Sequence, residues 1–185
     1  MPNFGYFEGD VITRWLTDPH DEDRDMELVE PFAYIDPSGK RWEASVGRKI
    51  NGATIPPWLW STVGSPYVGN YRRASVIHDV ACEDQTEPSE AVHLTFYHAM
   101  RCDGVKPAEA MVMYQAVKNW GPSWPSDTTI KTLATIPPPP EPAEIERLRS
   151  VVHQAVGELG NDATIEAIEA RMSENSRRYV PPELK

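Results

Sequence analysis

The chain has 185 residues, of which 18 are Lys or Arg and 28 are Asp or Glu, giving a net charge of −10. This length accommodates one domain with a hydrophobic core and a short appendage. The acidic balance argues against a duplex nucleic-acid binder, because such proteins hold the phosphate backbone through Lys and Arg. Two cysteines, Cys82 and Cys102, are too few for a disulfide scaffold and indicate buried thiols in a reducing compartment.

No targeting segment is evident in the sequence. The first ten residues lack the basic region and the apolar run of a signal peptide. No apolar stretch reaches the length of a membrane span. We therefore expect synthesis in the cytoplasm.

The N-terminal part predicts β-structure. Val11–Leu16 is a candidate short strand, and the acidic stretch Thr17–Asp25 is expected to be a solvated loop. The loop contains five carboxylates, but their spacing does not follow an EF-hand. Met26–Ile35 and Arg41–Val46 flank Asp36–Lys40, whose Pro and Gly are typical of a turn, so we expect a β-hairpin.

The middle of the chain predicts helices. Asn51-Gly52 is a turn signal, and a short apolar helix is expected over Trp58–Gly64. Three longer helices follow, with Pro at or near two of their starts and Gly after one of their ends. These three helices are expected over Arg72–Glu83, Pro88–Cys102 and Ala108–Trp120.

The C-terminal part is set apart by proline. Residues 136–142 form a stiff polyproline linker. An amphipathic helix is expected over Ala143–Glu158 and a second over Ala163–Met172, followed by a frayed polar tail from Ser173. The predicted fold is α+β, with an N-terminal β-hairpin region packed on three helices. The predicted domains are a core over 1–135, a linker over 136–142 and a separable helical tail over 143–185.

The helix over Arg72–Glu83 carries the most unusual residues of the chain. His78 and Asp79 are adjacent, so their side chains point about 100° apart, and Cys82 lies one turn after His78. A buried histidine is most often a hydrogen-bonded core residue, so a purely structural His-Asp pair is one interpretation. A Cys82–His78 nucleophile pair is another, although nothing in the sequence activates Cys82.

Several ordered segments resemble the DUF1353 family, a domain of unknown function common in phages and prophages. The family pattern runs from Asp-x-x-Ser-Ile-Pro through Arg-x-Ala-x-x-x-His-Asp to a helix that carries Ala-Asp and ends Phe-x-x-Ala-Met, then Gly-Val and Met-Tyr. The matching segments here are Asn51–Pro56, Arg73–Asp79, Val92–Met100, Gly104–Val105 and Met113–Tyr114. Two family Asp positions are occupied by Asn51 and His93, and each change removes a carboxylate.

A weaker local similarity points to the paired helices of bacterial phospholipase A2. In that family the helix His activates water, the next Asp binds Ca²⁺, and an Asp of the second helix orients the His. The matching positions here are His78, Asp79 and His93. The disulfides and the calcium loop of that family have no clear counterpart, so the resemblance implies local geometry alone.

These residues suggest a small hydrolytic site between two antiparallel helices. His78 is the candidate general base or ligand, Asp79 a metal ligand and His93 a second ligand, with Asn51 and Thr54 supporting them from the preceding turn. Two His and one carboxylate leave an open position on a Zn²⁺ or Fe²⁺ ion, whereas the phospholipase resemblance implies Ca²⁺. The expected function is a phage-associated, metal-dependent hydrolase.

The alternative is a non-catalytic phage virion or lysis-module protein. The proline linker and the amphipathic tail favour it, because such a helix needs a surface to dock on. Its partner would be a phage or virion protein bound through the tail. The location would then be the host cytoplasm or the virion.

Overall fold

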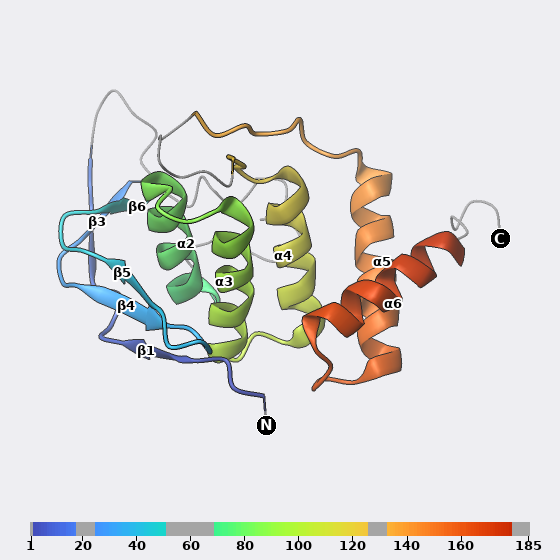
Figure 1. Cartoon of the computed structure of the whole chain (residues 1–185). Coiled ribbons are helices and arrows are strands. Elements are labelled where there is room, and N and C mark those ends of the chain that lie inside the picture. Colours follow the sequence, from blue (N-terminus) through green and yellow to red (C-terminus); the bar gives the residue numbers. More distant parts are fainter. Residues whose placement is uncertain (1, 18–24, 51–68, 126–132, 179–185) are drawn as a thin grey trace.

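The computed structural model describes residues 2–17, 25–50, 69–125 and 133–178. Most of the expected acidic loop, the Asn51-Gly52 turn, the short helix over Trp58–Gly64 and the supporting residue Thr54 lie outside the described residues. The described part is an α+β fold, with strands first and helices after them, which confirms the predicted class (Figure 1).

The described strands form two antiparallel sheets of three strands each. The first has the order β1-β4-β5, with bounds Tyr6–Glu8, Phe32–Ile35 and Arg41–Ala44. The second has the order β2-β3-β6, with bounds Thr13–Trp15, Met26–Leu28 and Lys49–Ile50. The short strand expected near Val11–Leu16 is confirmed as β2.

The predicted hairpin is confirmed as β4–β5, in which Phe32 lies opposite Ala44. Asp36 closes its turn, because its carboxylate accepts hydrogen bonds from the Ser38 N–H at 2.8 Å and the Trp42 Nε1–H at 3.0 Å. The expectation that 26–35 forms one strand was wrong, since 26–28 belongs to the other sheet. Pro31 lies at the break, and proline has no N–H to donate to a ladder.

Three consecutive helices stand side by side next to the sheets: α2 (Arg72–Asp84), α3 (Ser89–Cys102) and α4 (Pro107–Trp120) (Figure 1). All three were predicted within one or two residues. Their facing sides are mostly apolar and almost fully buried. The largest of these side chains are Phe96, Tyr97, Met100, Met111 and Met113.

An ion pair joins the start of α2 to the end of α3. Arg73 Nε donates to the two oxygens of the Asp103 carboxylate at 3.0 and 3.2 Å. The guanidinium carbon also lies 4.3 Å from the centroid of the Phe7 ring on β1. Since the first residues of α2 meet the residue after α3, the two helices are antiparallel, and the centre of one faces the centre of the other.

The C-terminal helices α5 (Pro142–Leu159) and α6 (Ile165–Arg178) pack on the far side of α4 (Figure 1). Val152 and Ile168 are fully buried and belong to the same hydrophobic core as the other helices. The helix α6 continues beyond Ser173, where a frayed tail was expected. The buried stripe of Ile165 and Ile168 repeats at Asn175, so the helix keeps contact with the protein to that point.

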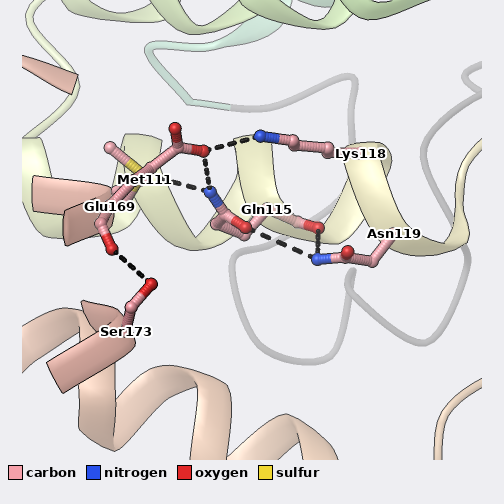
Figure 2. Close-up of polar contacts among 6 residues, drawn as sticks. All are labelled: Met111, Gln115, Lys118, Asn119, Glu169 and Ser173. Carbon is pink, nitrogen blue, oxygen red and sulfur yellow. Dashed lines mark hydrogen bonds and ion pairs between the residues drawn. The ribbon is translucent and has the colours of Figure 1, made fainter. Parts of the chain in front are cut away.

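Glu169 connects α6 to α4 (Figure 2). Its carboxylate accepts hydrogen bonds from Gln115 Nε2 at 2.8 Å and from Lys118 Nζ at 2.7 Å. The tail therefore docks on the chain's own α4, through apolar side chains and this polar bridge. Whether residues 143–185 can be removed without unfolding the rest stays a prediction.

Within the described residues, no helix combines the length and the apolar character that crossing a bilayer requires.

Candidate functional site

The imidazoles of His78 and His93 meet in the interface between α2 and α3. His78 Nε2 lies 2.9 Å from His93 Nδ1, which is hydrogen-bond distance. Both side chains are buried, with exposed fractions of 1% and 2%. The Phe96 ring covers His78 at a centroid distance of 4.7 Å, and Trp124 lies edge-on to His93. The histidines of two successive helices are thus brought together in an apolar setting.

The backbone assigns the proton positions of this pair. His93 Nε2 lies 3.0 Å from the carbonyl oxygen of Pro122, and a carbonyl only accepts, so Nε2 carries the proton. In neutral His93 the Nδ1 atom is then an acceptor, and His78 Nε2 donates to it. His78 on α2 therefore donates to His93 on α3, and His93 donates to the carbonyl of Pro122 in the loop after α4.

Burial keeps both imidazoles neutral. It lowers the pKa of His78 well below its ordinary value, and the neighbouring His93 lowers it further. Burial also lowers the pKa of His93 to about 4, against the opposing effect of the Pro122 carbonyl, which favours a proton on the ring. Neutral imidazole is the form that binds transition metals.

Cys82 is the third member of the cluster. Its Sγ lies 3.7 Å from His78 Nε2 and 3.9 Å from Nδ1, one turn further along α2. One ligand atom from each of His78, Cys82 and His93 can be chosen so that all three lie within 4.8 Å of one another. Burial raises the pKa of the Cys82 thiol well above its ordinary value, and the charge of Asp79 adds to the effect. This group could bind a metal ion.

Asp79 is not a member of this group, and as the next residue of the helix its side chain leaves α2 about 100° from that of His78. Its side chain is 8% exposed and lines a cleft of about 370 Å³ together with Cys82. Pro122, whose carbonyl accepts from His93, lines the same cleft. The cleft thus lies directly beside the cluster.

The structure places the expected site residues in two groups. His78 and His93 are in contact, whereas Asp79 is in the wall of the cleft and is not a member of the group that could hold an ion. The supporting residues Asn51 and Thr54 lie outside the described residues. Sequence reasoning missed Cys82 as a ligand, although its four-residue spacing from His78 was the available signal.

A larger groove of about 530 Å³ lies elsewhere, where α4, α5 and α6 meet. Its lining includes Lys118 and Glu169, which already bind each other, and no member of the His-Cys cluster. We therefore place the candidate site at the smaller cleft, because the reactive side chains are there.

Residues 26–117 match the family model of DUF1353, a protein of unknown function. The uncharacterized proteins y4jT and y4iH of Sinorhizobium fredii (strain NBRC 101917 / NGR234) are 40% identical over 105 residues and 38% identical over 97 residues. These matches cover 57% and 52% of this chain. They cover only 31% and 41% of the two relatives, less than half of either.

No solved structure matches the chain. Neither the family model nor the two relatives support the local similarity to phospholipase A2. The matched segment contains the whole His-Cys cluster and Asp79, and it ends within α4, before the C-terminal helices. Through residues 26–117, the chain belongs to the DUF1353 family.

Proposed function

We propose that this domain is a small phage-associated hydrolase that works in the cleft beside His78 and His93. The observation that carries the proposal is the cleft wall, where Asp79 and Cys82 lie immediately beside the buried imidazole pair. In this arrangement Asp79 accepts a proton from the attacking water, and the imidazoles stabilise the charge that develops. A divalent cation held by the imidazoles would supply a more acidic water.

The chemistry of the residues supports hydrolysis over redox or phosphoryl transfer to a nucleotide. A carboxylate beside neutral imidazoles suits water activation. The buried thiol is a poor free nucleophile, because burial raises its pKa and keeps it protonated. We therefore assign Asp79 as the group that accepts the proton of the attacking water. His78 and His93 are assigned to stabilise the charge that develops during the reaction.

The test is turnover of a substrate panel by the purified full chain. Chromogenic esters, phosphodiesters and peptide amides are offered with and without a chelator. Asp79→Asn should lower turnover by about 100-fold or more, because it removes the base and keeps the shape. The matched control is Asp84→Asn, on the same helix, whose carboxylate instead pairs with Arg48 at 2.6 Å. An Asp79→Asn variant as active as wild type would refute the proposal.

A second candidate function is favoured by the completeness of the hydrogen-bond chain. These hydrogen bonds run from His78 to His93 and on to the Pro122 carbonyl, so His78 Nε2 and both ring nitrogens of His93 have partners without any ion. On this account the pair stabilises the helix interface of a non-catalytic virion or lysis-module protein. Mass spectrometry of purified phage particles would detect it as a component. Absence from the particles together with turnover in the panel would exclude this alternative.

A further inference from the structure

We propose that His78 Nε2, Cys82 Sγ and His93 Nδ1 bind one Zn²⁺ ion, with the fourth coordination position facing the cleft. The ligand set differs from the one expected from sequence, because Cys82 takes the place of Asp79. The proposal also stands apart from hydrolysis, since binding of a zinc ion does not by itself establish turnover. Zinc binding and turnover are therefore tested separately.

The distances suit a tetrahedral ion after a small adjustment. Zinc at its usual bond lengths places two nitrogens about 3.3 Å apart and a nitrogen and a sulfur about 3.6 Å apart. His78 Nε2 and His93 Nδ1 are 2.9 Å apart, so the rings must separate by about 0.4 Å. Cys82 Sγ is 3.7 Å from His78 Nε2, which already matches. The ligand atoms of all three residues lie within 4.8 Å of one another, so the cluster is compact enough to surround a single ion.

The orientation of His93 is already the one a zinc ligand needs. Metal-binding histidines usually donate their other ring N–H to a backbone carbonyl or a carboxylate, which fixes the tautomer. His93 does this with the Pro122 carbonyl at 3.0 Å, leaving Nδ1 unprotonated and directed at the cluster. His78 must move its proton from Nε2 to Nδ1, because Nε2 becomes the ligand atom. Cys82 must release its thiol proton to solvent, because thiolate is the ligand form.

The donor atoms select the ion. Two imidazole nitrogens and a thiolate are preferred by Zn²⁺ and by neighbouring transition metals, whereas Ca²⁺ prefers oxygen ligands at longer distances. Calcium, which the local phospholipase similarity implied, is therefore not the ion expected at this cluster. Among the biological divalent ions, Zn²⁺ also favours the tetrahedral geometry that three protein ligands and one open position provide.

The open position gives the site access to small molecules. Cys82 lines the cleft, and so does Pro122, which holds His93. Asp79 lines the cleft as well, next to Cys82 and outside the coordination set. A water or an anionic ligand on the ion would thus face the Asp79 carboxylate. This is the layout of an exchangeable zinc site and not of a closed structural one.

The first experiment uses the wild-type full chain. After treatment with a chelator and dialysis, the protein is titrated with Zn²⁺ and, separately, with Co²⁺ as a coloured substitute. We expect one ion per chain, a near-ultraviolet thiolate-to-cobalt band, and intense visible bands that indicate four-coordinate geometry. Zn²⁺ should displace Co²⁺ and raise the melting temperature. Failure of the folded chain to take up either ion would overturn the proposal.

The second experiment assigns the ligands with matched variants. Cys82→Ser is nearly isosteric and should remove the thiolate band and weaken Zn²⁺ binding by more than about tenfold. The control is Cys102→Ser, since Cys102 is the other free cysteine and instead contacts the Gly5 carbonyl at 3.4 Å. Asp79→Asn should keep both the band and the affinity. Circular dichroism establishes that each variant is folded before titration.

The outcomes separate the proposals. Loss of the band in Cys102→Ser with its retention in Cys82→Ser would overturn the ligand assignment. Loss of zinc binding in Asp79→Asn would also overturn it, in favour of the His78–Asp79–His93 set. Zinc binding at Cys82 without turnover of any substrate would leave this site established and remove the hydrolytic function.

Discussion

Mild acid should destabilise the metal-free protein through its buried histidines. The pKa of His93 is lowered by burial to about 4, whereas an unfolded chain binds the same proton near 6.5. Between these values the unfolded state carries more protons than the folded state, so stability rises with pH and falls as the pH is lowered. A histidine paired with a carboxylate has a raised pKa and changes stability in the opposite direction, so that stability falls as the pH rises.

The magnitude follows from the two pKa values. A difference between 6.5 and about 4, at 1.36 kcal/mol for each pH unit, corresponds to about 3 kcal/mol for His93. About 2 kcal/mol of this should be lost between pH 7 and pH 4.5, before most carboxylates take up protons. His78 contributes in the same direction, because burial and His93 lower its pKa as well. The loss is a large share of the stability of a typical domain.

The assay is urea unfolding, followed by circular dichroism, in the presence of a chelator across this pH range. His93→Asn is the matched variant, because its amide oxygen can still accept from His78 but cannot take up a proton in this range. The variant should be less stable at neutral pH, by about 1 kcal/mol for the lost bond to Pro122. Its stability should vary less with pH. A wild-type loss below about 1 kcal/mol, or an equally steep variant, would refute the reasoning.

Three further predictions concern stability. Gln85→Gly should raise the free energy of unfolding in urea by about 1 kcal/mol. The reason is that Gln85 has a φ of 51° and a buried side-chain oxygen with no hydrogen-bond partner among the described residues. An unchanged or lower free energy of unfolding would contradict this. Asp103→Ala should lower the free energy of unfolding by about 1–3 kcal/mol, because Arg73 loses its carboxylate partner. An unchanged unfolding midpoint would show that the Arg73–Asp103 ion pair does not stabilise the fold. Truncation after Thr135 should leave a soluble core that melts cooperatively but at a lower temperature, because the truncation removes α5 and α6, which pack on α4. A non-cooperative melt by calorimetry would show that the tail completes the core.

Local signals explain why the helices could be predicted. Pro107 is the first residue of α4, and Gly104, with a φ of 84°, follows α3. Residues of these two types therefore indicate in the sequence where α3 ends and where α4 begins. The strands were harder, because β1 and β6 are three and two residues long and exist only by pairing with distant partners. A strand this short has too few residues to show an alternating pattern.

The sequence by itself determined that His78 and His93 would meet. A short break between two helices makes them pack antiparallel, and the two residues lie at similar distances from that break. The four-residue spacing also placed Cys82 on the same side of the helix as His78, but only the tertiary structure decided that this side of α2, and not the side of Asp79, faces His93. That choice depends on how far α2 is rotated about its own axis, which is set by the packing of its whole buried surface on the sheets and α3. Residues 79 and 82 point about 60° apart on a helix, so a modest rotation of α2 would exchange the thiol for the carboxylate, and the spacing of the residues does not fix that rotation.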